Sequence, residues 1–137
     1  MGDQMPSIKI KFHISADTFE ISEVTRKIGV VPTKTRTKES FPIQSIVAGT
    51  ACTLWTLETE TEDCLAVSIV FDNMMSMLNG KSEIIKSVCD DKKLSTSFEV
   101  VVRMYNGNNP ELVLPREVIS FAASIGAEIS FDLYCYD

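Results

Sequence analysis

The sequence predicts an α+β fold, a two-layer sandwich in which helices cover one face of a mainly antiparallel, five-stranded, loosely ferredoxin-like sheet. Residues 114–126 carry apolar side chains at three- and four-residue intervals and end in Gly126, as a helix with one buried face does. Residues 129–136 then alternate apolar and polar side chains, and residues 8–14 do the same. A sheet covered on both faces would carry continuous apolar strands, so this alternation indicates helices on one side only.

The first half of the chain predicts a strand, a helix, a loop and a second strand. The strand is expected at residues 8–14, and the helix opens near Asp17 and stops before Pro32. Residues 33–49 show no sustained period and predict a long loop with a short extended piece. Residues 50–58 are rich in β-forming side chains and predict the second strand.

The second half predicts two helices, a hairpin, and the closing helix and strand. The expected helices span residues 61–78 and 82–90, and the hairpin joins strands at 98–105 and 111–115 through the turn NGNNP. The full order is β-α-β-α-α-β-β-α-β, in a single domain of residues 1–137. A chain of this length buries roughly two thirds of its unfolded surface, so it needs no disulfide for stability.

Charge and composition favour a cytosolic protein that binds another protein. The net charge of −6 and the isoelectric point near 4.8 oppose binding to nucleic acids or anionic membranes, because polyanions select basic surfaces. The first residues show no cationic stretch followed by a long apolar run, so we expect no secretory signal. No segment approaches the roughly 20 apolar residues of a membrane span. The four cysteines are widely spaced, so we expect reduced, mostly buried thiols.

The motifs of common catalytic and cofactor sites are missing from the sequence. His13 is the single histidine, and it stands mid-strand with no candidate nucleophile close in sequence. Neither G-x-G-x-x-G nor G-x-x-x-x-G-K-S/T occurs, and no spacing of cysteine, histidine or carboxylate fits zinc or calcium. We therefore expect no catalytic residue, no cofactor and no metal, and a protein that is not an enzyme.

Two charged stretches are candidate binding surfaces. The acidic stretch consists of Glu58, Glu60, Glu62 and Asp63. It could meet a basic protein, where complementary charge raises encounter rate and specificity, or it could be the solvated start of a helix. The basic stretch consists of Lys34, Arg36 and Lys38. It could hold a phosphate or an acidic partner, or it could be a solvated loop.

The polar face of the predicted sheet is a third candidate surface. If the first and last strands share their buried face, one set of polar side chains projects to the same side: Lys9, Lys11, His13, Asp132, Tyr134 and Tyr136. Were the two strands neighbours, lysine–aspartate pairs across them would explain the pattern without any ligand. Alternatively the tyrosines form a binding surface, because they combine apolar area with a polar tip. We therefore include Asp132, Tyr134 and Tyr136 among the candidate partner-binding residues.

Several segments of the chain are similar to a bacterial family known as domain of unknown function forty-two seventy-nine (DUF4279). They are DTFEISEVTRKIGVVPTK after the first strand, the strand LWTL around Trp55, and LVLPREVISFAASIGAEISFDLY near the end. The likeness spans most of the chain, and its motifs are mainly core and turn positions. The resemblance therefore implies a fold and carries no catalytic residues to this sequence.

The leading functional hypothesis is a non-enzymatic, cytosolic protein-binding module. Small acidic bacterial proteins of this kind are often immunity partners of secreted toxins, and many nuclease toxins are basic, so the sharpest form is a toxin-neutralising immunity protein. The alternative is a small-ligand-binding or regulatory domain with a pocket between the Thr33–Gly49 loop and the sheet near Trp55. The oligomeric state and the identity of the partner are left open.

Overall fold

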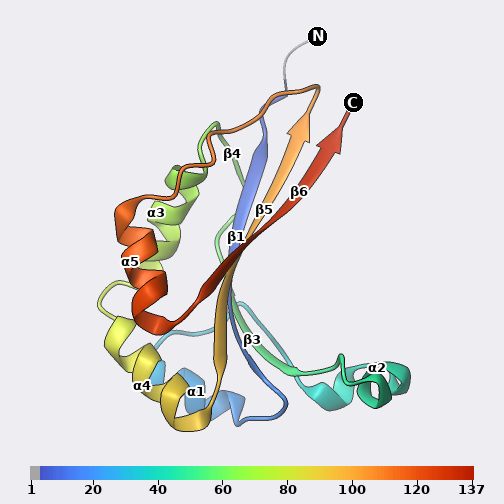
Figure 1. The fold of residues 1–137 in the computed structure, drawn as a ribbon, viewed down its shortest axis with the longest axis vertical. Coiled ribbons are helices and arrows are strands. Elements are labelled where there is room, and N and C mark those ends of the chain that lie inside the picture. Colours follow the sequence, from blue (N-terminus) through green and yellow to red (C-terminus); the bar gives the residue numbers. More distant parts are fainter. Residues whose placement is uncertain (1–3) are drawn as a thin grey trace.

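A computed structural model describes residues 4–137 and shows an open, twisted sheet with a layer of helices against one face (Figure 1). In chain order the elements are β1 (Ser7–Ala16), α1 (Ile21–Ile28), β2 (Lys34–Arg36), the 3₁₀ helix η1 (Lys38–Ser40), α2 (Ile43–Ala48), β3 (Thr53–Glu58), β4 (Glu62–Asp63), α3 (Val67–Met77), α4 (Ser82–Lys92), β5 (Ser95–Tyr105), α5 (Arg116–Ile125) and β6 (Glu128–Tyr136). The predicted α+β sandwich is confirmed.

The six strands lie in the order β2-β3-β1-β5-β6, and the short β4 pairs with the start of β1. All neighbouring strands are antiparallel except β5 and β6, which are parallel. The parallel pair follows from the chain path, because α5 carries the chain back along the sheet before β6 begins. The sheet is therefore mainly antiparallel, as predicted.

The sheet has six strands instead of the predicted five, because strands of two or three residues are too short to show an alternating pattern. β2 lies inside the predicted loop at residues 33–49, which also contains η1 and α2. Residues 111–115 are not a strand, and there Glu111 forms only an isolated bridge to Ala66. The flanking Pro110 and Pro115 lack the N–H groups that a ladder would use.

The start of the second predicted helix, expected at residues 61–78, is also corrected. We expected a helix from residue 61, but residues 62–63 form β4 and α3 begins at Val67. Cross-strand bonds to Ser7 and Ile8 hold this acidic segment extended. The carboxylates of Glu62 and Asp63 therefore do not sit in the first turn of a helix.

The core lies between the sheet and the helical layer and is centred on aromatic rings. Phe12 of β1 is fully buried between Trp55 of β3, with ring centroids 6.1 Å apart, and Phe98 of β5, at 4.9 Å. The indole Nε1–H of Trp55 donates a 3.0 Å hydrogen bond to Oγ1 of Thr25 on α1, so its polar atom is satisfied. Burying one such aromatic side chain contributes about 2–3 kcal/mol.

Four helices cover this core, and one lies elsewhere. Figure 1 shows α1, α3, α4 and α5 along one face of the sheet, as predicted, whereas α2 is set apart beyond the other side. None of the six residues of α2 is buried. No helix among residues 4–137 is long and apolar enough to cross a bilayer.

The last strand departs from the prediction that its apolar side chains are buried. Ile10 of β1 is fully buried, but Phe131 is 37% exposed and Leu133 is 48% exposed. Figure 1 shows why, because β6 is the edge strand and its C-terminal half runs away from α5. Only Ile129, at the beginning of β6, packs against the core.

Candidate functional site

The face of the sheet opposite the helical layer carries the candidate site. Register places the side chains of this open face in rows, since residues directly paired across strands point to the same side. One row contains Lys9, Val101 and Asp132. The next row, two residues further along β1, contains Glu58, Lys11, Glu99 and Ser130. A third row contains Lys34, Thr56, His13, Ser97 and Glu128. The polar residues of β1 and β6 therefore share one face, as expected.

The proposed lysine–aspartate pairs between the first and last strands are wrong, because β5 lies between β1 and β6. Lys9 faces Val101, and Asp132 lies one strand further away. Lys9 instead forms a 2.7 Å ion pair with Glu58 on β3. The neighbours of Asp132 must therefore be sought on β5 and β6.

Aromatic rings gather at the end of this face nearest the C-terminus. Tyr105 and Tyr136 stack with ring centroids 5.3 Å apart, and the guanidinium of Arg103 lies 5.2 Å from the ring centre of Tyr134. The Tyr134 hydroxyl donates a 2.8 Å hydrogen bond to Asp132. That bond and the nearby negative charge of Asp132 raise the pKa of the Tyr134 phenol above its usual value. Three of the predicted partner-binding residues thus form one surface.

The acidic stretch does not form a single surface. Glu58 faces the open side but is held by lysines, whereas the Glu62 side chain accepts a 2.8 Å hydrogen bond from Asn73 of α3 on the helical side. Asp63 lies opposite Ser7, in the row that also contains Arg103 and Tyr134. Glu60 is exposed between the two strands. Only Asp63 therefore shares a row with the tyrosine surface.

The basic stretch lines a hollow of about 340 Å³ at the other edge of the open face. Its wall and floor are formed by Lys11, His13, Lys34, Thr35, Arg36, Leu54, Thr56 and Glu58. Lys38 does not take part, because its Nζ pairs at 2.6 Å with Asp17. A ligand pocket was expected between the Thr33–Gly49 loop and the sheet near Trp55, and this hollow lies between residues 34–36 and the strand neighbours Leu54 and Thr56. Trp55 itself is fully buried and faces the helical layer.

Glu58 is the most enclosed charged group of this hollow. Its side chain is 4% exposed and its carboxylate lies 2.7 Å from Nζ of Lys9 and 3.5 Å from Nζ of Lys34. Burial by itself would raise the pKa of this carboxyl, but the hydrogen bond and charge of Lys9 and the charges of Lys34 and Lys11 outweigh it. The pKa of Glu58 therefore lies below its usual value, and the group is an anion at neutral pH.

His13 is fixed between two neighbouring strands. Its Nε2–H donates a 2.9 Å hydrogen bond to Oε1 of Glu99, and Nδ1 lies 2.9 Å from Oγ1 of Thr56. A carboxylate, an imidazole and a hydroxyl in a chain resemble part of a nucleophilic triad. However, Thr56 stands mid-strand and is nearly buried, and N–H groups of a strand interior pair with adjacent strands instead of forming an oxyanion site. These two hydrogen bonds hold the His13 ring in a fixed position in the wall of the hollow.

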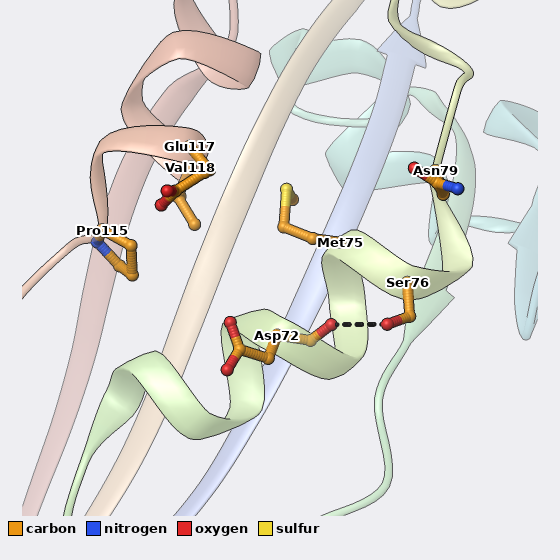
Figure 2. A pocket seen from close by; sticks show the side chains of 7 residues that line it. All are labelled: Asp72, Met75, Ser76, Asn79, Pro115, Glu117 and Val118. Atoms are coloured by element: carbon orange, nitrogen blue, oxygen red, sulfur yellow. Dashed lines mark hydrogen bonds between the residues drawn. The ribbon is translucent and has the colours of Figure 1, made fainter.

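A second hollow, of about 450 Å³, lies on the helical side between α3 and α5. Figure 2 shows Asp72 and Met75 of α3 on one side of this hollow and Glu117 and Val118 of α5 on the other. The Ser76 hydroxyl donates to the backbone carbonyl of Asp72, so it does not point a free donor into the space. The two carboxylates repel anions, and no set of three or more His, Cys, Asp or Glu in residues 4–137 is placed to hold a metal ion.

A protein-family model matches nearly all of the chain. The model of the family described as Domain of unknown function (DUF4279) matches residues 6–136. No curated protein and no solved structure matches the chain. The match covers the whole sheet and helical layer, including both ends of the open face. The resemblance seen in the sequence is thereby confirmed, and the chain belongs to the DUF4279 family.

Proposed function

We propose that this protein acts by binding another protein, without catalysis, and that the docking surface is the β6 edge. The partner adds an extended segment alongside β6 and continues the sheet, a mode in which backbone hydrogen bonds supply affinity and alternating side chains supply specificity. The observation that carries this proposal is a nine-residue edge strand that pairs only with β5 among residues 4–137 and exposes Phe131 and Leu133.

Among residues 4–137, the β6 edge has no lysine, proline, bulge or covering element, and its only charged side chains are the carboxylates of Glu128 and Asp132. Natural edge strands are blunted by lysine, proline, bulges or a covering element. The sequence EISFDLYCY contains no lysine, proline or glycine, and its pairing with β5 runs without interruption from Glu128 to Tyr136. Phe131 and Leu133 project on the helical side, where a partner strand would bury them.

The two sides of β6 define the chemistry of the partner. One side presents Phe131 and Leu133, and the other presents the carboxylates of Glu128 and Asp132 with the rings of Tyr134 and Tyr136. A strand that alternates apolar and basic side chains complements both sides. A second copy would align acidic edges against each other, and like charges directly opposite are destabilising. A basic bacterial toxin, neutralised by this chain as an immunity protein, is the sharpest form of the proposal.

The test is calorimetry of the full chain with the product of the adjacent gene, at low and at high salt. We expect tight binding that weakens with salt, because complementary charge contributes to association. Phe131→Lys places a charge where the partner's apolar residues would pack and is expected to abolish binding. Ile84→Lys is the matched control, since Ile84 is about as exposed but lies on α4.

Equal binding by the Phe131→Lys and Ile84→Lys variants would remove β6 from the interface and overturn the proposal. So would a stable homodimer in sedimentation velocity that the Phe131→Lys substitution dissociates, because the edge would then be occupied by the chain itself. Asp132→Asn tests the electrostatic part and is expected to lower the association rate and the salt dependence while the variant stays folded.

A further inference from the structure

We propose that the hollow at the β2 edge binds a small organic phosphate monoester. This inference is independent of the protein partner at β6. The hollow is lined by Lys34 and Arg36 of β2 and by Lys11 of β1, with Leu54 of β3 between these strands. A volume of about 340 Å³ lies at the lower end of the range for small-molecule sites. The ligand is therefore a compact molecule with one strongly charged group.

Positive charge is in excess around this hollow. The protein as a whole carries a net charge of −6, yet three cations and only one carboxylate, Glu58, line this hollow. Lys34 and Lys9 share that carboxylate, and within the described chain Lys11 forms no ion pair. Like charges gathered on one face destabilise a sheet unless something balances them. The residues that line the hollow therefore carry a net positive charge, which an anionic ligand would balance.

Arg36 is held in place for binding an anion. Its guanidinium lies 3.7 Å from the ring centre of Phe41, and its Nε–H donates a 3.3 Å hydrogen bond to Ser40. The stacking and the bond hold the planar group in place, and in residues 4–137 no hydrogen bond uses its two terminal nitrogens. A fixed fork of two donors fits the oxygens of a phosphate better than a mobile ammonium does.

The apolar part of the hollow favours a ligand that carries an organic group beside its phosphate. Leu54 and the aliphatic stems of the lysines give the hollow an apolar floor, whereas His13 and Thr56 are already hydrogen-bonded to each other. Inorganic phosphate would leave this floor in contact with water. An ester whose organic part covers Leu54 removes apolar surface from water, which favours the ester over the free ion.

The test is isothermal titration calorimetry of the full chain with phenyl phosphate, inorganic phosphate and benzoate. We expect phenyl phosphate to bind best, since it alone supplies both a dianion and an apolar ring. Arg36→Gln and Lys34→Gln should each weaken it about tenfold or more, the usual effect of losing a charge-assisted hydrogen bond. Lys34 is 69% exposed, so its substitution leaves the fold intact. Lys86→Gln, on α4, is the matched control and should not change binding.

Three outcomes would overturn the proposal: no heat with phenyl phosphate at millimolar concentration, equal affinity for inorganic phosphate, or equal loss in the Lys86→Gln control. The Phe131→Lys variant separates the two proposals, because it should lose the protein partner and keep phenyl phosphate. Buried Trp55 reports whether each variant is folded, through its fluorescence.

Discussion

Replacing Glu58 by glutamine is the most informative single perturbation of the open face. The substitution keeps the size of the side chain but removes the charge that Lys9 and Lys34 share and replaces one of its two accepting oxygens by an NH2 donor. Removing one partner of a fully buried ion pair costs about 3–5 kcal/mol. Here Lys9 is 27% exposed and Lys34 is 69% exposed, so water compensates part of the loss. We expect the free energy of unfolding to fall by about 2 kcal/mol.

The pH dependence identifies the cause of that loss. The pKa of Glu58 is lowered in the folded protein from an ordinary value of 4.5, because the lysines outweigh the effect of burial. The folded state therefore binds fewer protons than the unfolded state as the pH falls through this region. The contribution of Glu58 is complete above its unfolded pKa and disappears as the pH falls through the folded pKa. Wild type and Glu58→Gln should thus differ at neutral pH and converge in acid.

Urea denaturation followed by Trp55 fluorescence measures both effects, since the indole is fully buried in the core. Glu60→Gln is the matched control, because Glu60 is two residues away and exposed. It should change the free energy of unfolding by less than about 0.5 kcal/mol. The reasoning fails if Glu58→Gln is as stable as that control, or if its deficit persists unchanged in acid.

Burial and the charge of Asp90 raise the pKa of the Cys89 thiol to about 11. At neutral pH a maleimide should therefore label the exposed Cys135 rapidly and Cys89 only on unfolding. Peptide mass mapping measures the labelling of each cysteine. Gly29 ends α1 at φ +77°, a conformation that costs other residues about 1 kcal/mol, and Gly29→Ala should lower the urea midpoint accordingly. Asp132→Asn should lower the pKa of Tyr134 towards its usual value, measured by ultraviolet absorbance titration.

Long periodic elements of this fold were predictable because one buried face repeats along them. β1, β5 and α5 were expected within a few residues of their bounds for this reason. β2 and β4 have three and two residues, too few for a repeat to show, and they exist because β3 and β1 offer partners. The exposure of Phe131 could not be predicted either. An alternating pattern shows that one face of a strand is apolar, but it does not show whether a helix covers that face.

The candidate surfaces depended on strand order, which alternation does not determine. The tyrosines and Asp132 were predicted as one group because they alternate along a single strand. Arg103 and Glu99 escaped notice because their roles come from β5, which lies between the strands that were compared. The hollow could not be predicted, because it combines Lys11 of β1 with Lys34 of β2. β3 lies between these strands, and no local sequence pattern links the two lysines.

The two proposed sites can operate independently because of where the sheet places them. β6 and β2 are opposite edges, with β3, β1 and β5 between them. Lys11 of β1 and Glu99 of β5 lie opposite each other between the two edges, and their opposite charges weaken the electric field along the face. Salt screens this field further, over about 10 Å. Each strand between the edges is held by ladders on both sides, so no element offers a second arrangement for one ligand to favour. We therefore expect a phosphate ester at β2 to leave the affinity for a partner at β6 unchanged, since coupling between them would require the sheet itself to move.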